Sequence, residues 1–122
     1  MVRVVVVDDE LPVMQLCARV LELDGHQVDG FTRGEEALAR LSRAPADLLV
    51  VDYRMPGLTG LELARRARAV RPGLPVVLIT GHGSADVLAE AAAVGVDRVL
   101  LKPFTPNELI AAAAALTSPG RS

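Results

Sequence analysis

Five short apolar runs alternate with longer amphipathic segments along this chain, and that alternation constrains the fold more than any other feature. The runs are Val2–Val7, Val28–Phe31, Leu48–Val51, Val76–Thr80 and Val99–Leu101. Apart from the second, and with Arg3 as the one charged exception, they are apolar at consecutive positions, which is typical of strands buried on both faces of a parallel sheet. The resulting order, βαβαβαβαβα, predicts a single doubly wound α/β domain of the (βα)5 type. Its five-stranded parallel sheet should have right-handed crossovers and helices on both faces.

The segments between the runs have helical periodicity and marked ends. The first carries an apolar stripe at helical spacing, formed by Val13, Leu16, Cys17, Val20 and Leu21. Three residue pairs have the capping-box spacing that begins a helix: Thr32 and Glu35, Thr59 and Glu62, Thr105 and Glu108. Three glycines stand where a helix is expected to end: Gly25, Gly73 and Gly95.

The composition excludes several classes of protein. A chain of 122 residues with 51% hydrophobic and 23% charged residues is one folded domain, not a disordered segment. Its single cysteine excludes a disulfide framework. An aromatic content of 2% and a net charge of -2 predict no direct binding of nucleic acid or membrane. We expect a cytoplasmic domain over residues 1–117, with 118–122 as a tail or the start of a linker.

Polar side chains stand at the ends of four of the predicted strands. Asp8 and Asp9 end the first, Asp52 the third and Thr80 the fourth, and Lys102 follows the fifth. In an open α/β sheet, ligands bind beyond the carboxyl ends of the strands. Three carboxylates that meet there cannot all stay ionised unless a cation joins them. Hard oxygen ligands with open positions suit Mg²⁺.

Each feature also has a purely structural interpretation. Taken alone, Asp8–Glu10 would only favour the positive end of the helix that follows. Lys102 is the only lysine among 13 basic residues, and its retention at a solvated position could be chance. Its place directly after an apolar strand favours a site that needs a compact, rotatable charge in preference to the planar fork of arginine.

Four motifs give the chain a family resemblance. They are VVVVDDE at the first strand, VVDYRMPGLTG around Asp52, VVLITGHG at the fourth strand and VLLKPF at the fifth. With these motifs at these spacings, essentially the whole chain resembles a receiver domain of a two-component response regulator. The resemblance implies a sheet of strand order 2-1-3-4-5.

The resemblance also implies a phosphorylation site. Asp52 matches the phospho-acceptor, which takes a phosphoryl group from the phosphohistidine of a histidine kinase or histidine phosphotransfer protein. Asp8, Asp9, Asp52 and the backbone carbonyl of Arg54 match the ligands of Mg²⁺. The carboxylate of Asp52 would act as the nucleophile and form an acyl phosphate.

The switch residues follow from the same resemblance. Thr80 matches the hydroxyl that turns toward the phosphoryl group, and Lys102 matches the ammonium that pairs with it. Lys102-Pro103 matches a cis peptide bond. Val99 departs from the family pattern, because many receivers have an aromatic ring there. The resemblance implies a downstream effector, either in trans or in a domain missing from this chain.

Two other functions remain open. A phosphohydrolase of the haloacid-dehalogenase type would place a second aspartate two residues after its nucleophile, where this chain has Arg54, which cannot donate a proton near neutral pH. A degenerate receiver would serve only as a binding surface. This alternative is disfavoured, because the acidic, hydroxyl and ammonium residues of the site are all present: Asp8, Asp9, Asp52, Thr80 and Lys102. We therefore expect a signalling module and not an enzyme, apart from its own phosphorylation and dephosphorylation.

A few residues carry weaker expectations. Cys17 should be a buried structural thiol, and His26 a solvated loop residue. Arg54 and His82 match positions that tune the lifetime of the acyl phosphate. One group of arginines should form a solvated helix face: Arg65, Arg66, Arg68 and Arg71.

Overall fold

The computed structural model describes residues 2–81 and 83–117. The strands are β1 (Arg3–Val7), β2 (Gln27–Phe31), β3 (Leu48–Asp52), β4 (Val76–Thr80) and β5 (Arg98–Leu101). They form a parallel sheet with the strand order β2-β1-β3-β4-β5, as predicted. The predicted tail at 118–122 lies outside the described residues, as does His82.

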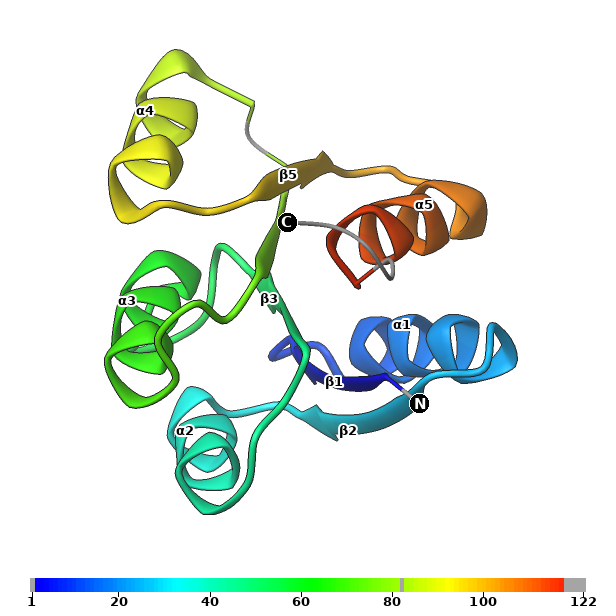
Figure 1. Ribbon diagram of the computed structural model, residues 1–122. Coiled ribbons are helices and arrows are strands. Elements are labelled where there is room, and N and C mark those ends of the chain that lie inside the picture. Colours follow the sequence, from blue (N-terminus) through cyan, green and yellow to red (C-terminus); the bar gives the residue numbers. More distant parts are fainter. Residues whose placement is uncertain (1, 82, 118–122) are drawn as a thin grey trace.

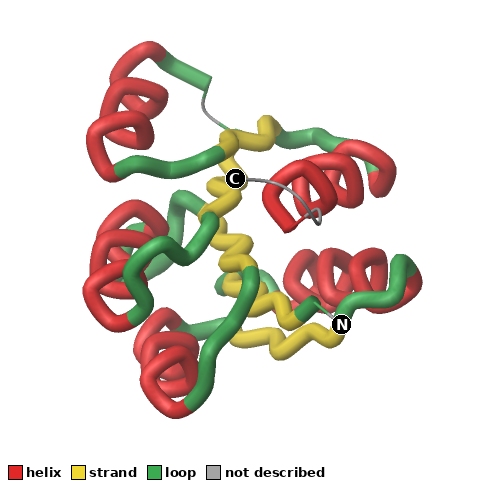
Figure 2. The backbone as a smooth tube through the Cα atoms, in the orientation of Figure 1, coloured by secondary structure: helices red, strands yellow, loops and turns green. Residues whose placement is uncertain are grey.

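A helix follows each strand, and the helices cover both faces of the sheet. They are α1 (Leu11–Leu23), α2 (Gly34–Arg43), α3 (Gly60–Val70), α4 (Ala85–Val94) and α5 (Pro106–Thr117). Figure 1 shows α1 and α5 on one face and α2, α3 and α4 on the other. The tube in Figure 2 shows the strands as the middle layer between these two groups of helices. The described part of the chain holds no helix long and apolar enough to cross a membrane.

The core is divided by the sheet into two apolar clusters. Successive side chains of a strand point to opposite faces, so Val5 and Val7 of β1 pack toward α2 and α3, whereas Val4 and Val6 pack toward α1 and α5. The central strands β3 and β4 are buried at every position. These two strands are therefore apolar at consecutive positions because both of their faces are buried, as the sequence indicated.

One of the three predicted capping boxes is complete, and at Thr59 the hydroxyl half of a second is present, while the Glu62 carboxylate accepts from Arg65. The Thr59 hydroxyl accepts the amide of Glu62 at 3.2 Å. At the start of α5, Thr105 and Glu108 satisfy each other's amides at 3.1 and 2.9 Å. The prediction for Thr32 is wrong, because α2 begins at Gly34 with Arg33 as its N-cap and no side-chain cap.

Two predictions of burial are also wrong. Leu16 belongs to the apolar stripe of α1, yet it is 61% exposed, because α1 buries a narrower stripe centred on Cys17 and Leu21. The strand β5 was expected to be buried on both faces, but it is an edge strand, and its Leu101 is 50% exposed. Cys17 itself is buried, as predicted.

Two predictions about polar residues need correction. The His26 side chain is only 11% exposed and lies 3.4 Å from a carboxylate oxygen of Asp24. Arg68 does not lie on a solvated face, because it reaches the Asp97 carboxylate at 2.6 Å. Arg71, which directly follows α3, donates to the carbonyl of Leu41 at 2.8 Å, so both arginines join this region to neighbouring segments. The other two arginines, Arg65 and Arg66, are exposed, as predicted.

Candidate functional site

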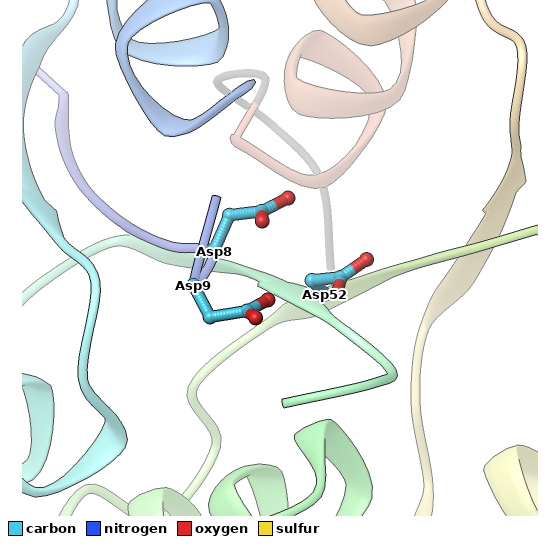
Figure 3. A group of neighbouring side chains, drawn as sticks. All are labelled: Asp8, Asp9 and Asp52. Atoms are coloured by element: carbon cyan, nitrogen blue, oxygen red, sulfur yellow. The ribbon is translucent and has the colours of Figure 1, made fainter. Parts of the chain in front are cut away.

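Three carboxylates meet at the carboxyl edge of the sheet. Asp8 and Asp9 follow β1, and Asp52 is the last residue of β3. One oxygen from each lies within 4.8 Å of the others. Asp8 and Asp52 are buried, and Asp9 is exposed. Figure 3 shows the three side chains gathered beside the ends of these two strands, as the sequence predicted.

The sheet itself sets this arrangement. Val7 of β1 is in register with Val51 of β3, so the residues that follow both strands emerge side by side. Hydrogen bonds to the outer neighbours hold the backbone in place. The amide of Asp8 donates to the carbonyl of Phe31 at 3.1 Å, and the amide of Tyr53 donates to the carbonyl of Ile79 at 2.8 Å. The carboxylates therefore project from an edge fixed by hydrogen bonds to neighbouring strands.

Lys102 places a positive charge beside two of the carboxylates. Its Nζ lies 3.0 Å from Oδ1 of Asp52 and 3.9 Å from Oδ2 of Asp8. Its amide donates to the carbonyl of Thr80 at 2.9 Å, which continues the pairing of β4 and β5 beyond the end of β5. The Lys102-Pro103 peptide bond is cis, as the resemblance implied.

A pocket of about 360 Å³ opens onto these groups. Thr80 ends β4 and is 1% exposed, yet it contributes to the lining. The pocket is lined by Asp9, Glu10, Asp52, Arg54, Thr80, Gly81 and Lys102. All three residues predicted to act on a phosphoryl group, Asp52, Thr80 and Lys102, therefore face one space.

Burial and mutual repulsion shift the ionisation of the carboxyl groups. Burial raises the pKa of Asp8 to about 6, and the charges of Asp52 and Asp9 act in the same direction. Burial also raises the pKa of Asp52, although the hydrogen bond from Lys102 opposes that rise. Burial lowers the pKa of Lys102, but its hydrogen bond to Asp52 and the nearby negative charges outweigh this and raise it overall.

The donor set fits a hard divalent cation. Oδ1 of Asp8 accepts the amide of Glu10 at 2.9 Å, whereas its buried Oδ2 has no hydrogen-bond partner among the described residues. The ammonium of Lys102 lies 3.9 Å from this oxygen, which is too far for a hydrogen bond, and a buried carboxylate oxygen without one is costly. Asp9 and Asp52 place further carboxylate oxygens within reach of the same point. Carboxylates with open positions are the ligands that Mg²⁺ prefers.

The backbone amide of Glu10 was not anticipated from the sequence. It holds the Asp8 carboxylate in an Asx turn, a local pattern in which an aspartate accepts the amide two residues on. The signal was available, because Asp8 precedes a helix at the spacing that such a turn requires.

Val99 is half-buried and packs against the apolar cluster that includes residues of α3 and α4.

Comparison with known proteins identifies the family. A match to the response regulator receiver domain spans residues 4–114. The chain therefore belongs to the receiver domains of two-component response regulators, which are signal-transduction modules.

Named relatives and solved structures agree with this assignment. The chain is 38% identical over 112 residues to the phosphate regulon transcriptional regulatory protein PhoB of Rhizobium meliloti (strain 1021), a match that covers 89% of this chain and 49% of that relative. It is 36% identical over 119 residues to the transcriptional regulatory protein TcrA of Mycobacterium tuberculosis (strain ATCC 25618 / H37Rv), which covers 98% of this chain and 47% of TcrA. The chain thus spans about half the length of these relatives.

The fold is shared with receivers of known structure. The chemotaxis protein CheY4 of Vibrio cholerae superposes with a TM-score of 0.90 at 30% identity, over 95% of this chain and 98% of that one. The receiver domain of NtrX from Brucella abortus gives a TM-score of 0.88 at 31% identity, over 96% of this chain and 99% of that one.

Proposed function

We propose that the chain is a phosphorylation-switched receiver whose acceptor is Asp52. The observation that carries the proposal is the place of the Asp52 carboxylate. The residue is 5% exposed, its carboxylate lies 3.0 Å from the ammonium of Lys102, and one of its oxygens lies within 4.8 Å of oxygens of Asp8 and Asp9. A buried nucleophile beside one fixed cation and an acidic cluster fits phosphoryl transfer, in which the protein mainly positions groups and stabilises charge.

The donor would be the phosphohistidine of a histidine kinase or histidine phosphotransfer protein. A carboxylate oxygen of Asp52 attacks phosphorus, the phosphorus–nitrogen bond breaks, and the imidazole leaves as an acyl phosphate forms. Asp8, Asp9, Asp52 and the backbone carbonyl of Arg54 would hold Mg²⁺. When bound, the ion neutralises charge on the phosphoryl oxygens.

The chain's own residues would then respond to the new group. Once Asp52 carries phosphate, the ammonium of Lys102 pairs with a phosphoryl oxygen in place of the free carboxylate. The hydroxyl of Thr80 lines the same pocket and can donate to another phosphoryl oxygen. The backbone around Thr80 would shift with it and change the surface presented to a partner.

The output of this switch would be an effector, in trans or in a further domain. The named relatives include transcriptional regulators about twice as long as the matched region. We propose that residues 1–117 form the receiver and that 118–122 are a tail or the start of a linker. A phosphohydrolase is disfavoured, because the position two after Asp52 holds Arg54 and not a carboxylic acid.

The test is uptake of phosphate from acetyl phosphate, followed by intact mass. Wild type should gain one phosphoryl group when Mg²⁺ is present and none in EDTA, and alkaline hydroxylamine should remove it. Asp52→Asn should take none. Asp47→Asn is the matched control, because Asp47 is exposed just before the opposite end of the same strand. Equal labelling of Asp52→Asn and wild type would overturn the proposal.

A further inference from the structure

Gly60 packs against the backbone that carries the acceptor. It is the first residue of α3, and its amide donates to the carbonyl of Tyr53 at 2.9 Å. A Cβ built on Gly60 would lie 2.2 Å from the carbonyl oxygen of Asp52, 2.9 Å from its carbonyl carbon and 3.0 Å from Cα of Tyr53. The backbone of α3 therefore approaches the end of β3 more closely than any side chain allows.

The reason for glycine here is space and not conformation. Gly60 is not among the residues with positive φ. Glycine is also a poor helix former, so its place inside the first turn of α3 lowers the intrinsic helix propensity there. Thr59 already caps this helix, so its start does not depend on a glycine.

We propose that Gly60 is a positioning residue for phosphoryl transfer, because the absent side chain lets the start of α3 set where the Asp52 backbone lies. The proposal rests on the proposed function of Asp52. The strand end cannot retreat freely from a new side chain, since Asp52 is in register with Ile79 and the amide of Tyr53 is bonded to the same strand. The start of α3 is tied to the same segment by the hydrogen bond from Gly60 to Tyr53, so a shift of either one acts on the peptide that bears the acceptor carboxylate.

The displacement is large compared with what the site tolerates. An ordinary contact of a Cβ begins at 3.4 Å, so a contact of 2.2 Å has to open by roughly 1 Å. A misplacement of about 1 Å can cost 100-fold in rate, even when its cause lies away from the chemistry. The carboxylate of Asp52 would lose its alignment with Lys102, which is 3.0 Å away, and with the carboxylates of Asp8 and Asp9.

Gly34 offers a matched control. It is the first residue of α2, as Gly60 is of α3, and it too is buried. A Cβ built there would lie 2.7 Å from the Cδ2 atom of Leu58, which is the end of a flexible side chain and not backbone. Gly34→Ala therefore introduces crowding at a helix start without pushing on the backbone of Asp52.

The experiment compares wild type, Gly60→Ala and Gly34→Ala. Unfolding in urea gives the stability of each, NMR titration gives the affinity for Mg²⁺, and mass spectrometry gives the rate of phosphorylation at saturating Mg²⁺ and acetyl phosphate. We expect Gly60→Ala to phosphorylate about 10- to 100-fold more slowly than wild type. Gly34→Ala should stay within about twofold of wild type, whatever stability it loses, because its crowding relaxes in a side chain.

Two results are decisive against the idea, and they differ. A folded Gly60→Ala that phosphorylates as fast as Gly34→Ala overturns the positioning role, while a wild type that takes no phosphate overturns the proposed function itself. If Gly60→Ala is unfolded in buffer, all three chains are measured in trimethylamine N-oxide, which favours the compact state. The same rate comparison then decides the question.

Discussion

The buried carboxylate of Asp8 should make the metal-free protein less stable than a variant that lacks its charge. The side chain is 3% exposed, and its pKa is raised from 3.8 to about 6, chiefly by burial. A carboxyl group whose pKa is higher in the folded state binds its proton more tightly there. Stability therefore falls as pH rises from about 3.8 to about 6, and the loss is complete above that window.

The shift sets an upper limit on the effect. About two pKa units correspond to roughly 3 kcal/mol of destabilisation above pH 6. In Asp8→Asn the amide oxygen can still accept the amide of Glu10, so that hydrogen bond survives. The new amide nitrogen replaces the oxygen that lies 3.9 Å from the Lys102 ammonium, so the loss of this attraction offsets part of the gain in stability. We expect Asp8→Asn to be more stable than wild type by about 1–3 kcal/mol at pH 7.5 in EDTA.

Urea unfolding followed by circular dichroism measures this difference. It should shrink at pH 5, where wild-type Asp8 takes up its proton. It should also shrink in saturating Mg²⁺, which stabilises only a chain that binds it. Asp9→Asn is the control, and it should change stability less, because Asp9 is exposed. The reasoning is refuted if Asp8→Asn is less stable than wild type in EDTA at pH 7.5, or if the difference is independent of pH.

Three further predictions concern the switch. Lys102→Arg keeps the charge but replaces a compact ammonium by a planar fork, so NMR shifts induced by phosphorylation should be reduced; unchanged shifts would show that charge alone suffices. Arg54→Ala and His82→Ala should each alter the lifetime of the acyl phosphate, timed by mass spectrometry after the donor is removed, and two unchanged lifetimes would contradict this. Val99 has no ring to rotate, so structures with and without beryllofluoride should differ at Thr80 and the loop after it, with little rotamer change at Val99; an unmoved Thr80 would count against the switch.

The order of elements was predictable because buried parallel strands and amphipathic helices have different hydrophobic periods. The threonine caps predicted at Thr59 and Thr105 also marked true helix starts. Thr32 has the same spacing but lies one residue too early to cap α2, which begins at Gly34 after Arg33. Spacing alone does not decide which residue leaves the extended conformation first, since tertiary packing selects among nearby starts.

Exposure at the edges was harder to predict. Leu16 and Leu101 read as core residues because they continue apolar patterns, yet both are at least half exposed. Whether such a residue is covered depends on the neighbours that the completed sheet supplies. Since β5 is at the edge of the sheet, it has a strand on one side only.

The site was predictable to the level of residues but not of contacts. Strand ends brought Asp8, Asp52 and Lys102 together, because parallel strands carry their carboxyl ends to one edge. The sequence could not reveal that Lys102 lies nearer to Asp52 than to Asp8, or that the carbonyl of Asp52 leaves no room for a side chain at Gly60. The position of the Lys102 ammonium and the packing at Gly60 both depend on side-chain and loop geometry at the scale of about 1 Å. The hydrophobic periodicity of a sequence carries no information at that scale.

The most direct test of the central claim is to locate the phosphoryl group. Phosphorylated protein is reduced with borohydride, which converts an aspartyl phosphate to homoserine, and is then digested and sequenced by mass spectrometry. We predict homoserine at position 52 alone, and only after treatment with acetyl phosphate and Mg²⁺. Homoserine at position 8 or 9, or a phosphate that survives reduction on a hydroxyl side chain, would contradict the assignment of Asp52 as the acceptor.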